Sequence, residues 1–143
     1  MTERIQKTMN FLKEYLENGT NDDLQYRYFH SLRVASIGQK IARAEGMNEE
    51  ALIIGCLLHD ISYANLVYGE GVWLTHGRES AKIARPFLET LGFEEEVVNE
   101  ICFGIAIHVD DEADFEGERT ALALTIGDCD NIDRFDTYRI YDN

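Results

Sequence analysis

The sequence predicts an all-α fold, a helical bundle that forms a single domain over residues 1–143, and three observations favour it. Apolar residues recur mostly at spacings of three and four, which is the period of an amphipathic helix. The chain has only one proline, so few positions interrupt a helix. Its 143 residues fit one domain on the scale of roughly 100 to 200 residues per domain, and 45% of them are hydrophobic, which is enough for a core.

Capping residues mark where the expected helices begin and end. Six helices are expected, over residues 3–17, 24–45, 48–60, 75–91, 94–109 and from about 120 onward. Gly19 and Gly46 follow the first two helices and can take the left-handed conformation that closes a helix. Asn48 and Thr75 are suitable N-caps for the third and fourth. Residues 61–74 have no clean period and are expected to form a loop or a broken helix.

The chain is strongly acidic, and this restricts its partners. Thirteen Lys and Arg residues against 27 Asp and Glu residues give a formal net charge of −14. Such a charge repels polyanions, so nucleic-acid polymers are not expected as partners. A small phosphorylated substrate is still compatible with this charge if bound divalent cations cancel the local negative potential. For such a substrate, metal would be a requirement.

Cysteine usage and hydropathy indicate a soluble, cytoplasmic protein. The three cysteines, Cys56, Cys102 and Cys129, are odd in number and form no close pair, so neither a disulfide framework nor a cysteine zinc site is expected. The longest apolar run, residues 51–58, is far shorter than a membrane span, and no membrane association is expected. The charged, amphipathic N-terminus does not resemble a targeting segment. The sequence leaves the oligomeric state open.

Four histidines and a few aspartates interrupt the apolar pattern. His30, His59, His76 and His108 each lie inside or at the edge of a different expected helix. One histidine per helix can converge on a point in the core, as in helical metal sites, although each taken alone could be a packed core histidine. Asp60 directly follows His59 at the end of an apolar helix, and Asp128 and Asp130 lie in another. Buried carboxylates without partners are costly, so function is the better explanation of these positions.

This ordered set resembles the HD superfamily of metal-dependent phosphohydrolases, which is named for its adjacent histidine and aspartate. The resemblance covers residues of about 26–136. Its pieces are His30-Ser-Leu-Arg33-Val-Ala, Leu57-Leu58-His59-Asp60-Ile61, His76-Gly77-Arg78-Glu79-Ser80-Ala81, Ile107-His108 and Asp128-Cys129-Asp130-Asn131-Ile132-Asp133. An isolated His-Asp pair is common by chance, whereas the ordered set in these helical contexts is specific.

The resemblance implies a set of ligands for each of two metal ions. It makes His30, His59, Asp60 and Asp130 the ligands of a first ion. Members with both intervening histidines can bind a second ion, with Asp60 bridging and with His76 and His108 as further ligands. Asp128 and Asp133 are expected to support the ligands rather than to bind metal directly.

The donor types agree with this implication. Neutral imidazoles and carboxylates suit Fe, Mn, Co, Ni or Zn, whereas an all-oxygen site would suit Mg or Ca. Two ions about 3.5 to 4 Å apart can activate a bound water as hydroxide and stabilise charge on phosphoryl oxygens. We therefore expect a divalent transition metal, as two ions, and Asp60 among the catalytic residues.

Several basic and aromatic side chains are candidates for contacts with the substrate. The basic residues near the ligands in sequence are Arg33, Arg78, Lys82 and Arg134. Each could grip a phosphate or simply pair with an acidic residue, and Arg33 and Arg78 are the preferred functional candidates. Tyr63, Tyr68 and Trp73 could cover the site, but core packing is favoured for them, as it is for Tyr26 and Tyr28. The acidic stretch from residue 110 is expected to be a solvated face.

Two departures from the family pattern bear on the substrate. Asn131 stands where many relatives have arginine, which weakens the expectation of a phosphate contact there. The residues after Asp60 are Ile-Ser-Tyr-Ala instead of the acidic pair of the stringent-response ppGpp hydrolases, which argues against that substrate.

The sequence thus predicts hydrolysis of a phosphoester or phosphoanhydride in a small substrate, with a nucleotide preferred. Two alternatives use the same residues. Di-iron oxygenases of the HD superfamily share the histidine and aspartate set, and a regulatory module could keep the metal without turnover. Metal dependence and oxygen dependence distinguish the three.

Overall fold

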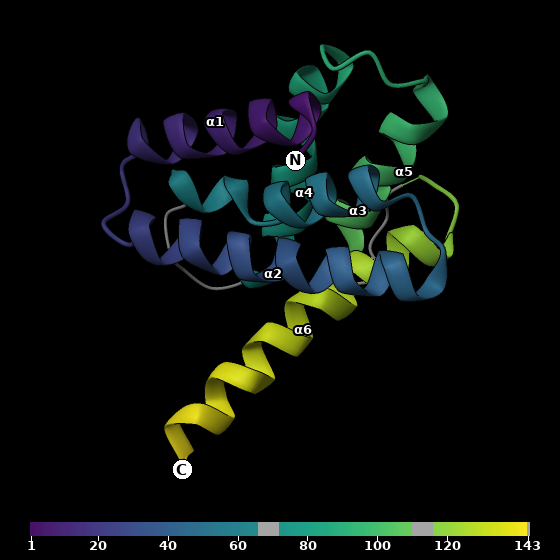
Figure 1. The fold of residues 1–143 in the computed structure, drawn as a ribbon. Coiled ribbons are helices and arrows are strands. Elements are labelled where there is room, and N and C mark those ends of the chain that lie inside the picture. Colours follow the sequence, from purple (N-terminus) through teal and green to yellow (C-terminus); the bar gives the residue numbers. More distant parts are fainter. Residues whose placement is uncertain (66–71, 110–115, 143) are drawn as a thin grey trace.

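Six α-helices and one short 3-10 helix make up the described part of this computed structural model (Figure 1). The structure describes residues 1–65, 72–109 and 116–142, and it describes the backbone alone for residues 72–74 and 136–142. The helices are α1 (Glu3–Glu17), α2 (Leu24–Glu45), α3 (Glu49–Leu58), η1 (Ile61–Ala64), α4 (Val72–Glu89), α5 (Glu95–Ile107) and α6 (Ala121–Asp142). The predicted all-α fold is confirmed.

α3 is the central helix of the bundle. Every residue from Ala51 to Leu58 is buried, and α3 contacts each of the other α-helices. A helix that is apolar on all sides has to be surrounded in this way. Asn48 accepts a hydrogen bond from the amide of Ala51 at 3.1 Å and so caps α3 as expected. The end of α3 therefore brings His59 and Asp60 into the interior.

The glycines after α1 and α2 have different roles. Gly46 has a φ of 71° and closes α2 in the left-handed conformation, as expected. Gly19 is not among the glycines with positive φ, so the left-handed cap expected there is wrong. A Cβ at Gly19 would instead collide with the backbone of Ala64. The turn after α1 is pinned to that backbone, because the amides of Thr20 and Asn21 donate to the Ala64 carbonyl.

The segment expected to be irregular contains η1 and the first turn of α4. α4 begins at Val72, three residues before Thr75, so the expected N-cap lies inside the helix. The helix ends at Glu89, and Gly92 follows with a φ of 79°. Tyr68, the side chain of Trp73 and most of the acidic stretch from residue 110 lie outside what the structure describes.

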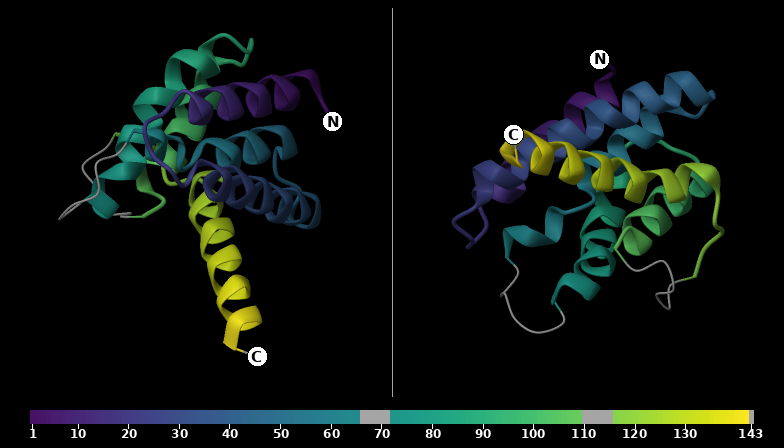
Figure 2. Two further views of the ribbon diagram at one scale, coloured as in Figure 1. Left: turned by 90° about the vertical axis from the view of Figure 1, so that its left-hand side faces the viewer. Right: turned by 90° about the horizontal axis from the view of Figure 1, so that it is seen from below.

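α6 packs against helices from distant parts of the sequence. Thr120 caps it by accepting a hydrogen bond from the amide of Ala123 at 3.1 Å. The helix contacts α2, α3 and α5, and its C-terminal part runs on past the other helices (Figure 2). None of the described helices combines the length and the apolar character that crossing a bilayer requires.

Candidate metal centre

The six expected ligands converge in the interior of the bundle. His30, His59, Asp60 and Asp130 form a first group, and Asp60, His76 and His108 form a second; within each group the potential ligand atoms lie within 4.8 Å of one another. All six side chains are buried. They come from α2, α4, α6 and the residues that follow α3 and α5. The bundle therefore assembles residues from five separate parts of the sequence.

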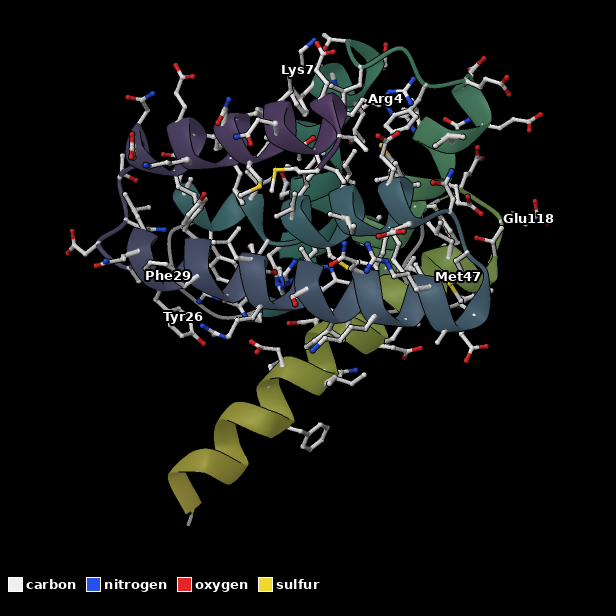
Figure 3. All side chains as sticks on the ribbon, viewed as in Figure 1. Arg4, Lys7, Tyr26, Phe29, Met47 and Glu118 are labelled. Carbon is white, nitrogen blue, oxygen red and sulfur yellow. The ribbon has the colours of Figure 1, made fainter. Side chains whose placement is uncertain are left out.

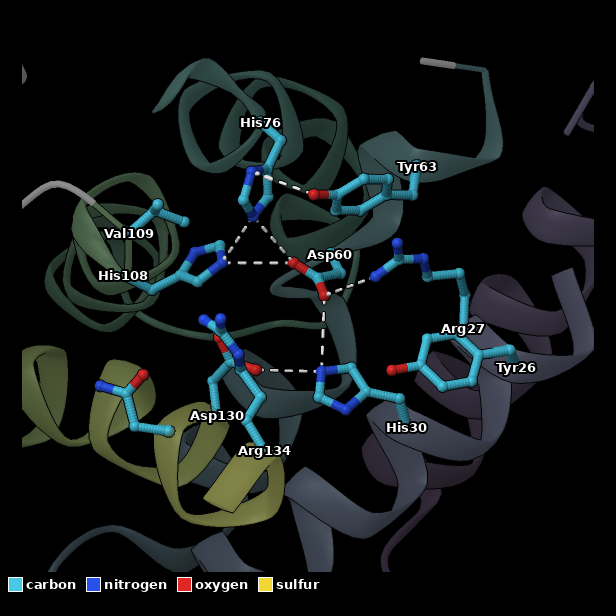
Figure 4. Close-up of a pocket in the computed structure, with 11 residues that line it drawn as sticks. Tyr26, Arg27, His30, Asp60, Tyr63, His76, His108, Val109, Asp130 and Arg134 are labelled. Atoms are coloured by element: carbon cyan, nitrogen blue, oxygen red, sulfur yellow. Dashed lines mark hydrogen bonds and ion pairs between the residues drawn. The ribbon is translucent and has the colours of Figure 1, made fainter. Parts of the chain in front are cut away.

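Asp60 lies between the two groups, and each of its oxygens faces one of them (Figure 4). Oδ2 lies 3.5 Å from His30 Nε2 and 3.2 Å from His59 Nε2. Oδ1 lies 3.1 Å from His76 Nε2 and 3.2 Å from His108 Nε2. A carboxylate with one oxygen on each side has the geometry that a bridging ligand needs.

Two of the rings are oriented by the ends of helices. His59 and His108 directly follow α3 and α5, where the last carbonyls of a helix lack partners within it. His59 Nδ1 donates to the carbonyl of Cys56, and His108 Nδ1 donates to that of Ile105, both at 2.6 Å. With Nδ1 as the donor, Nε2 is directed toward the cluster and is the nitrogen available for a metal.

His30 is oriented by a carboxylate. Its Nδ1 lies 2.7 Å from Oδ2 of Asp133, and Arg33 Nε donates to the other oxygen of Asp133 at 2.9 Å. Asp133 lies one turn after Asp130 on α6, so both face α2. The expected supporting role of Asp133 is compatible with this contact, because a carboxylate on Nδ1 fixes the ring and makes it a more basic ligand.

His76 reaches the cluster because α4 packs closely against two elements. Ser62 Oγ donates to the carbonyl of His76 at 2.9 Å, which ties η1 to α4. A Cβ at Gly77 would lie 2.7 Å from the carbonyl oxygen of Ala106, so only glycine lets α4 approach α5 this closely. The ring itself has the hydroxyl of Tyr63 at 3.5 Å from Nδ1.

In the first group, the surroundings of His30, His59 and Asp60 favour the charged form of each side chain when no metal is bound. Desolvation lowers the pKa of His30, but hydrogen bonds to Asp130 and Asp60 outweigh it and raise the pKa to about 9. Desolvation also opposes charge on His59, yet the charge of Asp60 and hydrogen bonding to Asp130 raise its pKa well above the usual value. Burial disfavours the carboxylate form of Asp60, but the charge on His59 and hydrogen bonds from the histidines hold its pKa well below the usual range. Protons therefore compete with a metal ion for the Nε2 atoms of His30 and His59.

A cavity of about 480 Å³ opens onto the cluster (Figure 4). Its lining consists of Tyr26, Arg27, His30, Asp60, Tyr63, His76, His108, Val109, Asp130, Asn131 and Arg134. Imidazoles and carboxylates dominate the inner wall, and this donor set fits a divalent transition metal. The two arginines balance the two aspartates in the lining, so the charge of bound ions would remain to attract an anion.

Most of the basic side chains expected to contact the substrate lie away from the cavity. Arg33 pairs with Asp133 and does not line the cavity, and Lys82 pairs with Glu79 at 3.4 Å. Arg78 is half-buried and also absent from the lining, and its Nε has no hydrogen-bond partner within the described part of the chain. The preference for Arg33 and Arg78 as phosphate contacts thus disagrees with the geometry, because neither faces the cavity. Arg134 does line it.

Asp128 also differs from expectation. Its side chain is exposed and lines a neighbouring hollow, which shares His108, Val109 and Asn131 with the cavity but does not include Asp130. Two residues along a helix correspond to a turn of about 200°. Because Asp130 faces the cluster, Asp128 faces away from it. The geometry therefore does not favour the expected supporting role of Asp128.

Two further residues line the cavity: Arg27, which was not among the predicted site residues, and Tyr26, which was predicted to pack in the core. Tyr26 is 55% exposed and lies on the outer side of α2 next to Phe29, at the rim of the cavity (Figure 3). Arg27 Nη1 lies 3.7 Å from Oδ2 of Asp60. Arg27 precedes His30 by three residues, and that spacing on one helix face was the available signal.

Comparisons with known proteins agree with this geometry. The family model described as "HD domain" matches residues 27–135. The crystal structure of a predicted HD superfamily hydrolase from an uncultured Thermotogales bacterium is similar, with a TM-score of 0.72 and 24% sequence identity over 96% of this chain and 74% of that one. No curated protein sequence matches the chain. The matched residues include all six side chains of the cluster.

Proposed function

This chain belongs to the HD domain family, and from that premise we propose that it is a metal-dependent phosphohydrolase that cleaves a phosphoester or phosphoanhydride in a small substrate, with a nucleotide preferred. The hydrolase in the name of the similar structure from the Thermotogales bacterium supports the reaction class. We also propose that the cluster holds two divalent transition-metal ions, from among Fe, Mn, Co, Ni and Zn.

The observation that carries this proposal is the position of Asp60. Each oxygen of its carboxylate faces a different pair of histidine Nε2 atoms, at 3.1 to 3.5 Å. Two ions that share such a carboxylate would supply an acidified water nucleophile and neutralise charge on the phosphoryl group. A site for one ion would have no use for two more buried histidines on the far side of Asp60.

The chain's own residues prepare the site before a substrate arrives. The carbonyls of Cys56 and Ile105 and the carboxylate of Asp133 each accept a hydrogen bond from the Nδ1 of one histidine. These contacts hold the rings with Nε2 directed inward, so the side chains would need little reorganisation to bind metal. The buried position of the cluster limits the access of bulk water to the reacting phosphoryl group.

The cavity supports a small substrate. Its volume of about 480 Å³ lies within the range of roughly 300 to 1,000 Å³ that is typical of small-molecule sites. Tyr26 lines the cavity and is 55% exposed, so its ring offers an aromatic surface on which a nucleobase could stack. This arrangement favours a nucleotide over a simple phosphate ester.

The experiment is phosphate release from a panel of nucleotides and sugar phosphates, without oxygen, with Mn²⁺ or Co²⁺ added. We expect metal-dependent release that Asp60→Ala abolishes and that the matched carboxylate variant Asp128→Asn retains, because Asp128 lies outside the cavity. Turnover that requires Fe and O₂ would identify an oxygenase instead. Bound metal without any turnover would identify a regulatory module.

A further inference from the structure

We propose that Arg27 is the residue that binds a non-bridging phosphoryl oxygen of the substrate, and this inference rests on the proposed phosphohydrolase function. Arg27 lies on α2 and lines the cavity beside Asp60. Its guanidinium carbon lies 3.7 Å from the centre of the Tyr63 ring and 5.3 Å from that of Tyr26. The group is thus held between two aromatic rings at the mouth of the metal centre.

The surroundings of Arg27 fix its direction. Nε donates to Oδ2 of Asp23, one turn earlier on the same helix, at 3.2 Å. Tyr63 follows the His59-Asp60 pair on η1 and presents its ring face to the guanidinium. The side chain is only 18% exposed. Stacking on the Tyr63 ring and the ion pair with Asp23 together hold a planar fork that matches phosphate geometry.

The contact with Asp60 identifies the position that an anion would take. Arg27 Nη1 lies 3.7 Å from Oδ2 of Asp60, which is an ion pair longer than a normal hydrogen bond. A guanidinium has five N–H groups, so contacts with Asp23 and Asp60 are compatible with a further anionic acceptor. A phosphoryl group lying over Asp60 and its ions would have oxygens on the side where Arg27 stands (Figure 4).

The other arginines fit this role less well. Arg33 is engaged by Asp133 outside the cavity. Arg134 lines the cavity from α6, but its side chain is exposed, whereas Arg27 is largely buried and seated on Tyr63. A partly desolvated guanidinium interacts more strongly with an anion than an exposed one does.

The test measures inorganic phosphate binding by calorimetry to the full chain loaded with Mn²⁺, for the wild type and for Arg27→Ala, Arg27→Lys and Arg43→Ala. Arg43 is the matched control, since it is an exposed arginine on the same helix that pairs with Glu49 away from the cavity. We expect Arg27→Ala to weaken phosphate binding roughly 10- to 100-fold, the usual range for a lost hydrogen bond to a charged group. Arg27→Lys keeps the charge but not the fork and is expected to fall in between, while Arg43→Ala matches the wild type.

Metal content and turnover, measured on the same samples, separate the explanations. We expect all variants to keep the wild-type metal content, and the KM of Arg27→Ala for any substrate found to rise more than its kcat falls. A wild type that does not bind phosphate would overturn the inference, as would Arg27 variants that bind it like the wild type. It would also be overturned if the Arg27 variants lose metal, because Arg27 would then act through Asp60 alone. If Arg27→Ala does not fold, Arg27→Lys decides. Phosphate binding that depends on Arg27 in a protein that hydrolyses nothing would reject the phosphohydrolase and leave the role of Arg27 standing.

Discussion

The two halves of the cluster are built from similar side chains but are held differently. In the first group, His30 is fixed by a carboxylate and His59 by a backbone carbonyl, at 2.7 and 2.6 Å. In the second, His108 is fixed by a carbonyl at 2.6 Å, whereas among the described residues the contact of His76 Nδ1 is the Tyr63 hydroxyl at 3.5 Å. A contact of 3.5 Å is at the outer limit of a hydrogen bond.

The two groups should therefore hold their ions with different affinity. Among the described residues, the first group has four potential ligands, two of which are carboxylates. The second has three, and its one carboxylate is the shared Asp60. More charge and better-oriented rings both raise metal affinity. We therefore expect the first group to bind its ion more tightly and the second to exchange its ion more readily.

The largest effect is expected from Asp60→Ala, because it removes the side chain common to both groups. Both ions should be lost, and with them the stabilisation that binding confers, about 2.7 kcal/mol for an ion present at 100 times its Kd. Elemental analysis and thermal unfolding measure the two effects. Full metal content with an unchanged Tm would show that Asp60 is not a ligand.

Single histidine variants should affect the two ions separately. His108→Ala and His76→Ala should each lower the metal content from about two ions to one, since the first group is left intact. His59→Ala should remove the more firmly held ion and lower the Tm further than either of them. Equal decreases in Tm for His59→Ala and His108→Ala would contradict the order of affinity.

Much of this arrangement was predictable from the sequence, for identifiable physical reasons. α1 and α2 begin and end at the predicted residues, because the glycines that follow them and the change from apolar to polar residues mark their ends locally. The start of α4 was missed because Thr75 resembles an N-cap, and nothing local shows that the helix begins earlier at Val72. The grouping of ligands followed from the resemblance to the HD superfamily.

The substrate-facing side chains were less predictable. Arg27 and Arg33 both lie three residues from His30, so helical spacing treats them alike. The choice between them depends on Asp133, which is 100 residues from Arg33 in sequence and meets it only after α6 packs on α2. Side-chain pairing across such a distance is set by tertiary structure.

A smaller effect is expected from Asp133→Asn, which keeps the shape but removes the charge that holds His30. Loss of such a supporting carboxylate typically costs about 10- to 100-fold in metal affinity. Binding of the first ion should be weakened and binding of the second should be unchanged, as measured by competition with a chelator. Asp128→Asn is the matched control on the same helix, because Asp128 is exposed and outside the cavity. Equal effects of the two variants would show that the contact between Asp133 and His30 does not matter.

The smallest effect concerns pH. Without metal, the folded pKa of His30, about 9, lies above its ordinary value of 6.5, so its stabilising contribution is complete below about pH 6.5 and is lost as the pH rises through 9. The carboxylates, whose pKa values are lowered, contribute fully throughout this range. Metal binding instead strengthens as protons leave Nε2. The Tm difference between Mn²⁺-loaded and metal-stripped protein should therefore widen from pH 6.5 to 9, and a constant or narrowing difference would contradict this.

The most direct test of the bridging role of Asp60 is electron paramagnetic resonance of the protein loaded with two equivalents of Mn²⁺. Two ions that share one carboxylate and lie about 3.5 to 4 Å apart should be magnetically coupled. In His108→Ala, the spectrum of the bound metal should become that of a single isolated ion. A wild-type spectrum of one isolated bound ion, with the second equivalent free in solution, would contradict the account.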